Sequence, residues 1–186
     1  ENPPREGLAL WLSADQGVGQ HDGHVVAWHD LSALQHVAKA PDRFTGPTVD
    51  TEHPALRFTN QTLLRIDTRI LPAETREFTI LAVGQADAAP SVGLFSIRNS
   101  AVPLIQLDVD ENTNTRFVLR DRLSRTLTAS TRCILGAKTL FGGILSRKDA
   151  EAGQTEVLFG ADIEPGTTGQ FASPLADSGA WIGGLV

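Results

Sequence analysis

Two carboxylates on alternate positions of one segment are the first residues in this sequence that could carry chemistry. The segment reads Gln106-Leu107-Asp108-Val109-Asp110, so in a strand its polar side chains would share one face. Two carboxyl groups on one face can divide the roles of acid and nucleophile in glycoside hydrolysis. However, the first position is an uncharged Gln, and an Arg partner lowers the pKa of a carboxylate, which opposes a general-acid role. We therefore expect no catalytic residue here, and we interpret the segment as the polar face of a sheet.

The segment that follows, Arg116-Phe117-Val118-Leu119-Arg120, alternates in the same way. A hairpin centred on Thr113 predicts that Asp110 faces Arg116 and that Gln106 faces Arg120, with the apolar faces of both strands together. Candidate ligand-binding residues on this polar face are Gln106, Asp108, Arg116 and Arg120.

The run Asp108-x-Asp110-x-Asn112-x-Asn114 offers alternating oxygen ligands of the kind that calcium takes. It lacks the Gly and the bidentate Glu of an EF-hand loop, so we interpret it as a polar hairpin tip. A calcium site elsewhere stays open, without a sequence feature that locates it. No other cofactor is evident.

Four histidines fall close together in the sequence, but zinc needs ligands that converge. His24 and His29 have opposite parity on one expected strand and so point to opposite faces. We therefore predict no metal site among these histidines. The four histidines are His21, His24, His29 and His36.

The sequence has three Trp and no Tyr. We expect Trp11, Trp28 and Trp181 to pack in the core, which leaves no visible aromatic platform for a sugar. The single Cys133 excludes an internal disulfide, and its alternating surroundings predict a buried strand residue.

The positioning elements are expected to be strands. Leu8 to Leu12 reads as a strand buried on both faces. Asp22-Gly23 predicts a hairpin turn just before the strand His24 to Asp30. About a dozen short strands with Gly and Pro punctuation, and no amphipathic helix, favour an all-β, two-sheet antiparallel β-sandwich.

Composition narrows the partners. With 186 residues the chain fits one domain, and the net charge of −6 with interspersed signs disfavours nucleic acid. No apolar run is long enough for membrane insertion. The chain shows no signal peptide and no initiator Met, so we expect a mature or excised piece of a longer protein.

Several short segments resemble LamG-like domains of the concanavalin A-like lectin/glucanase class. They cover nearly the whole chain: Leu10-Trp11-Leu12-Ser13-Ala14-Asp15, Trp28-His29-Asp30-Leu31-Ser32, Pro54-Ala55-Leu56-Arg57-Phe58, Phe78-Thr79-Ile80-Leu81-Ala82-Val83 and Trp181-Ile182-Gly183-Gly184.

The resemblance implies a concanavalin A-like jelly roll over residues 7–186, after a linker over residues 1–6. Such domains usually continue with one more strand after their Ile-Gly-Gly segment. We expect that this chain was cut from something longer and lacks that strand; the alternative is that another segment fills its place. Glucanases of this fold carry Glu-x-Asp-x-Glu on one strand, where this chain has Gln106 and Asp110 as the outer residues.

The resemblance also implies an exported module, extracellular, periplasmic or at the cell surface. We expect a recognition or scaffolding domain of a larger protein, not an enzyme by itself, that binds carbohydrate or a protein surface and contacts other domains of its own polypeptide. One alternative is a structural module that packs on a catalytic domain and takes no free ligand. The other is a glycoside-active enzyme.

Overall fold

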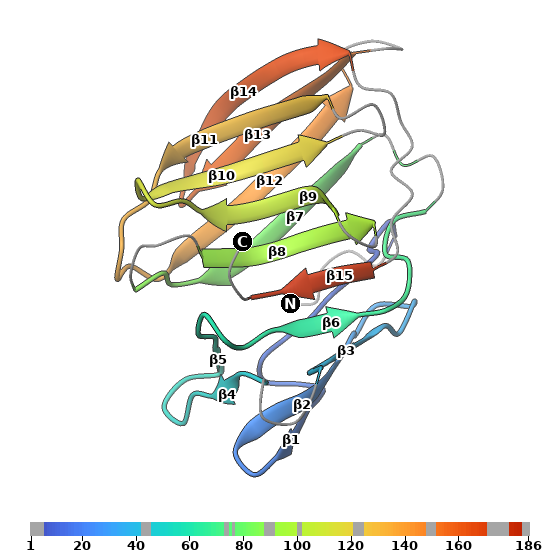
Figure 1. Cartoon of the computed structure of the whole chain (residues 1–186), viewed down its shortest axis with the longest axis vertical. Helices are drawn as coiled ribbons and strands as arrows, with labels where there is room; N and C mark the ends of the chain where they lie inside the picture. The colour runs from blue at the N-terminus through green and yellow to red at the C-terminus, as the bar shows by residue number, and fades with distance from the viewer. Residues whose placement is uncertain are drawn as a thin grey trace.

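The protein is a sandwich of two antiparallel β-sheets (Figure 1). The computed structural model describes residues 6–41, 46–72, 75, 77–87, 92–99, 102–120, 125–147, 152–170 and 179–183. These residues form strands, turns and extended segments, and they include no helix that is long and apolar enough to span a membrane. The all-β, two-sheet antiparallel β-sandwich expected from the sequence is confirmed.

The larger sheet holds most of the strands and carries the site described below. Its last strand in the sequence, β15, lies between β8 and β6 and pairs with both, so the end of the described chain lies in the interior of the sheet and not at its edge (Figure 1). The strand order is β11 (Thr126–Arg132), β10 (Asn114–Arg120), β9 (Val102–Val109), β8 (Val92–Asn99), β15 (Gly179–Ile182), β6 (Leu64–Ile66), β3 (Val37–Lys39), β2 (His24–His29), β4 (Thr48–Val49) and β5 (Leu56–Arg57), with β1 (Val18–His21) paired to β2.

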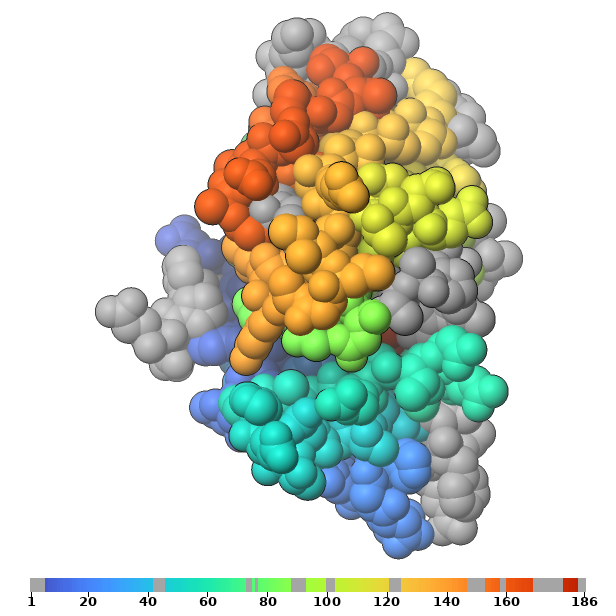
Figure 2. Space-filling model, turned by 90° about the vertical axis from the view of Figure 1, so that its left-hand side faces the viewer, coloured from blue at the N-terminus to red at the C-terminus, as the bar shows by residue number. Residues whose placement is uncertain are grey.

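The smaller sheet has four strands. Figure 2 shows the molecule from one edge. At this edge lie the β9–β10 hairpin (yellow-green) and the loop that leads from β11 into the smaller sheet (orange). The strand order is β14 (Asp162–Gln170), β13 (Ala152–Phe159), β12 (Thr139–Arg147) and β7 (Phe78–Gly84).

Alternating side chains fill the space between the sheets. On β10, Phe117 and Leu119 are fully buried, whereas Arg116 and Val118, at the alternate positions, are partly exposed. The ring of Phe117 meets that of Phe78 edge-on, with the ring centres 6.1 Å apart. Cys133 is buried, as predicted, and burial raises the pKa of its thiol.

The Asp22-Gly23 turn is confirmed, but its partner strand differs from the prediction. Both residues have positive φ, 50° and 79°, as a type I′ hairpin requires. The strand that pairs with β2 is Val18–His21, and Leu8 to Leu12, predicted as a strand, makes no ladder.

A buried carboxylate explains why that first apolar run is not a strand. Asp30 is 5% exposed, and its Oδ1 accepts hydrogen bonds from the N–H groups of Trp11 and Ser32, both at 2.8 Å. Its Oδ2 accepts from the Ser32 hydroxyl at 2.6 Å and from the His36 N–H at 3.1 Å. The segment around Trp11 is thus held by the Asp30 side chain and by a hydrogen bond from the Leu31 N–H to the Trp11 carbonyl at 2.8 Å, without a strand ladder. Leu10 and Leu12 still pack against the core.

The two sheets are tied together along one edge by a threonine. The Thr167 hydroxyl on β14 accepts from the Thr128 N–H of β11 at 2.7 Å and donates to the Thr128 carbonyl at 3.2 Å. Gly166 makes room for this approach, because a Cβ there would lie 2.4 Å from the Ala129 Cβ. The side chain therefore replaces a backbone ladder between two edge strands.

We expect Thr167→Val to lower the free energy of unfolding by about 1 kcal/mol, since it leaves both backbone groups of Thr128 without this partner. Urea unfolding measures the change. Thr167→Ser is the matched control, because it keeps the hydroxyl. Equal losses in the two variants would show that the hydroxyl contributes nothing.

Candidate functional site

The outer face of the larger sheet carries a row of polar and aromatic side chains. Strand register aligns Gln106 of β9 with Ser96 of β8, and Ser96 with Trp181 of β15. The row continues to Arg65 of β6 and Lys39 of β3. The residues on either side of Gln106, Ile105 and Leu107, are buried in the core, so Gln106 itself faces outward.

Trp181 lies on this outer face, and the prediction that it packs in the core is wrong. The guanidinium carbon of Arg98 lies 4.1 Å from the centre of the indole ring, which is a cation–π contact. Alternation along β15 gives the reason: Ala180 and Ile182 take the inward positions and are buried, so Trp181 between them must point outward. The same parity is visible in the sequence.

A small hollow lies beside Trp181. It has a volume of about 20 Å³, enough for about one water molecule, so it is not a large cleft. Its lining combines aromatic residues, polar residues and two glycines. The lining residues are Gly93, Phe95, Ser96, Arg98, Gln106, Trp181 and Gly183.

The β9–β10 hairpin places Asp108, not Asp110, opposite Arg116, and the predicted register is therefore wrong. Gln106 faces Val118, not Arg120, and Arg120 faces Thr126 of β11. The same side chains remain on the same face, because the true turn centre is one residue before Thr113 and both arrangements keep the parity of each strand.

The Asp110 side chain sets the true turn. Its Oδ1 accepts from the N–H groups of Asn112 and Asn114, each at 2.9 Å, and its own N–H donates to the Asn114 carbonyl at 2.9 Å. Thr113 has φ of 62°, the left-handed residue that closes a three-residue hairpin loop. Burial raises the pKa of Asp110, but the hydrogen bonds from Asn114 and Asn112 and the charge of Arg116 bring the pKa below its ordinary value.

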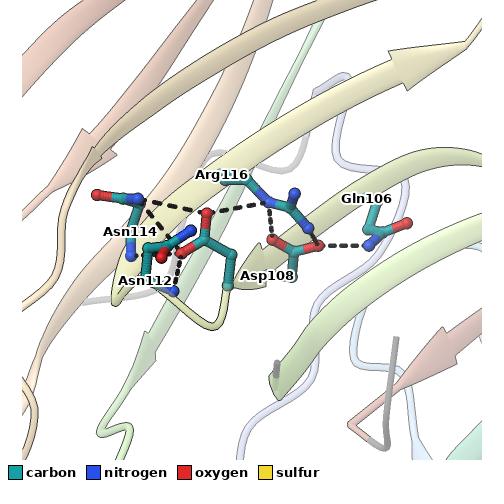
Figure 3. Close-up of polar contacts among 6 residues, drawn as sticks. Gln106, Asp108, Asn112, Asn114 and Arg116 are labelled. Atoms are coloured by element: carbon teal, nitrogen blue, oxygen red, sulfur yellow. Dashed lines mark hydrogen bonds and ion pairs between the residues drawn. The ribbon is translucent and has the colours of Figure 1, made fainter. Parts of the chain in front are cut away.

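Asp108 and Arg116 form a two-pronged ion pair (Figure 3). Asp108 is fully buried, and its Oδ1 and Oδ2 accept from Nε and Nη2 of Arg116, both at 2.9 Å. Gln106 Nε2 donates to the same carboxylate. Hydrogen bonding to Asp108 raises the pKa of Arg116, and the nearby negative charges add to this effect while burial opposes it.

This geometry gives each acid a structural role. Asp108 is held by Arg116 and Gln106, and Asp110 caps the hairpin, so neither is arranged as one of two carboxylates that share acid and nucleophile roles. Among the described residues, no three His, Cys, Asp or Glu side chains converge as metal ligands. The groups of this face that can meet a ligand are the Trp181 indole, the Gln106 carbonyl and the outer edge of the Arg116 guanidinium.

Comparison with known proteins adds little. No protein-family model matches the chain, and no curated protein matches its sequence. The structure is similar to a solved structure titled alginate lyase AlgAT5 from Polysaccharide Lyase family 7, with a TM-score of 0.35 and 10% identity over 90% of this chain and 72% of that one.

This comparison corrects the expectation that the domain is not an enzyme by itself. A solved structure to which the chain is similar is titled an alginate lyase, which is an enzyme. At 10% identity and a TM-score of 0.35, the similarity assigns neither an activity nor a residue role, and it does not single out LamG-like domains.

Proposed function

We propose that this chain is a polysaccharide-binding domain, whose ligand lies across the outer face of the larger sheet over the row Gln106–Ser96–Trp181. The observation that carries the proposal is the outward position of Trp181 beside the hollow. An aromatic ring with a few convergent polar groups is a common arrangement in sites for small ligands. The proposal concerns binding of the polysaccharide and holds whether the bound glycan is then released intact or cleaved.

The polar neighbours of Trp181 suit the hydroxyl groups of a sugar. The Gln106 side-chain amide donates a hydrogen bond to Asp108 through Nε2. Its carbonyl oxygen is therefore left to accept a hydrogen bond from a ligand. Ser96, on the neighbouring strand between Gln106 and Trp181, can donate or accept. The proposal includes a location of the protein outside the cytoplasm, which the resemblance to LamG-like domains implies.

The test is a binding titration against a panel of soluble polysaccharides. Trp181→Ala should weaken the affinity for the bound polysaccharide at least tenfold, about 1.4 kcal/mol or more, because a central aromatic contact is lost. Ile163→Thr is the matched control, since Ile163 is 56% exposed on β14 of the other sheet and should leave the affinity unchanged.

Two results would contradict the proposal. One is a folded wild-type protein that binds no polysaccharide of the panel above background, as expected for a structural module that takes no free ligand. The other is a folded Trp181→Ala variant with wild-type affinity. The same mixtures should be assayed for shortening of the polysaccharide, which would show that the bound glycan is cleaved.

A further inference from the structure

We propose that the ligand of this face is an anionic polysaccharide, whose carboxylate or sulfate groups are bound by the arginines around Trp181. This inference rests on the proposed function and specifies its ligand class. It is carried by the distribution of charge over the larger sheet and by the fixed geometry of one guanidinium.

Positive charge gathers on the outer face of the larger sheet, although the whole chain has a net charge of −6. Strand register and the Arg98–Trp181 contact place six basic side chains here: Lys39, Arg65, Arg98, Arg116, Arg120 and Arg132. Three acidic side chains accompany them on the same face: Asp67, Asp108 and Asp110. The face is therefore basic on an acidic protein, which favours an anionic partner.

The acidic side chains of the face are already engaged. Asp108 is fully occupied by Arg116 and Gln106, and Asp110 by the N–H groups of its own hairpin. Asp67 pairs with Arg65, with Oδ1 2.7 Å from Nε. Glu111, at the hairpin tip, adds a negative charge near Arg116.

Several positive charges remain available. Within the described residues, Lys39, Arg120 and Arg132 make no ion pair with an acidic side chain. Arg116 uses Nε and Nη2 on Asp108, while Nη1 has no partner among the described residues. The Arg116 side chain is 37% exposed, so this remaining nitrogen can meet a ligand.

Arg116 is held in place before any ligand arrives. Its bidentate contact with the buried Asp108 fixes the guanidinium plane (Figure 3), so less side-chain entropy is lost when the free edge binds an anion. Arg120 lies four residues along the same strand, about 13 Å away at the backbone. β10 is two strands from β8, about 10 Å, so these charges surround the Trp181 row at distances that one extended glycan could span.

The experiment uses polysaccharide pairs that share a backbone and differ in charge. Dextran sulfate is compared with dextran, and polygalacturonate with its methyl ester, against the full chain at low and at moderate salt. We expect at least one charged member to bind at least tenfold more tightly than its neutral counterpart, and its affinity to fall as salt rises. Which charged member binds tells carboxylate from sulfate recognition.

Variants connect that preference to this face. Arg120→Gln combined with Arg132→Gln should weaken binding of the charged polysaccharide threefold to tenfold and reduce its salt dependence, with Asp108 and its ion pair left intact. Lys138→Gln, in the loop before β12, removes a positive charge elsewhere and should have no effect.

The failures of the two proposals are distinguishable. The anionic ligand would be overturned if neutral and charged polysaccharides bound equally and the arginine variant had no effect on affinity. If Trp181→Ala still lowered the affinity in that case, the polysaccharide-binding function would stand. If the charged polysaccharides bound the Arg120→Gln, Arg132→Gln variant as tightly as the wild type, these arginines would not be the groups that recognise the anionic charge. No binding to any member would overturn both proposals.

Discussion

Asp30→Asn should lower the free energy of unfolding by about 3 kcal/mol, because a buried backbone donor left without its acceptor costs about 1–3 kcal/mol. Each carboxylate oxygen of Asp30 accepts from at least one backbone N–H. In either orientation, the asparagine amide turns its NH₂ toward one of these donors and cannot accept from it. Urea denaturation, with the midpoint and the slope both fitted, measures the loss.

The control for this variant is Asp22→Asn. It makes the same chemical change at an exposed type I′ turn position, where Asn is favoured as much as Asp, and should change stability by less than about 0.5 kcal/mol. If Asp30→Asn unfolded at the wild-type midpoint, the anchoring role of this carboxylate would be wrong.

Acid should remove the same stabilisation. Burial raises the pKa of Asp30, but the hydrogen bonds from the Ser32 hydroxyl and from the N–H groups of Trp11, Ser32 and His36 outweigh burial and hold the pKa below its ordinary value. Because the unfolded chain binds the proton more readily, the contribution is present above about pH 4 and is lost as the pH falls through the native pKa. The gap in stability between wild type and Asp30→Asn should therefore narrow in acid.

Gly143→Ala should also destabilise the fold, by about 3 kcal/mol, because it overfills the core. A Cβ on Gly143 would lie 2.2 Å from Cδ2 of Phe117, a ring that is fully buried. The ring also meets the ring of Phe78 edge-on, which limits how far it can move. The midpoint of thermal or urea unfolding measures this loss.

Gly84→Ala serves as the control, since a Cβ there would meet Phe141 at an ordinary 3.8 Å. The double variant Gly143→Ala with Phe117→Leu should recover part of the loss of the first change, because the smaller side chain makes room. Strictly additive losses would show that the clash with Phe117 is not the cause.

The sandwich could be predicted from alternation alone, because burial on one face of a strand leaves a period of two in the sequence. Ile105 and Leu107 face the core and Gln106 and Asp108 face outward, as expected. A Gly-Gly pair inside a strand is typical of close packing, and Gly143 does lie close against the Phe117 ring.

Pairing partners could not be predicted, because single polar side chains decide them. Asp110 caps its own hairpin and moves the turn centre by one residue, which gives Arg116 a different partner. Asp30 replaces the expected ladder beside Trp11. Neither effect has a periodic signature.

The candidate site was found in part. Gln106, Asp108 and Arg116 do come together, and Arg120 lies on the same face of β10. Trp181 and Arg98 were missed, because a tryptophan was assumed to be buried by its size. The parity of Ala180 and Ile182 held the information that would have placed it outside.

The most direct test follows the three indole N–H signals in a ¹H–¹⁵N spectrum during titration with a polysaccharide that binds. The Trp28 indole N–H donates to the Ser13 carbonyl at 2.8 Å, at the margin of the core, while Trp181 lies at the outer hollow. We expect the Trp181 signal to shift and saturate with the binding curve, and the Trp28 signal to stay in place. Saturable binding that leaves the Trp181 signal unmoved would place the ligand elsewhere and contradict the proposed function of this face.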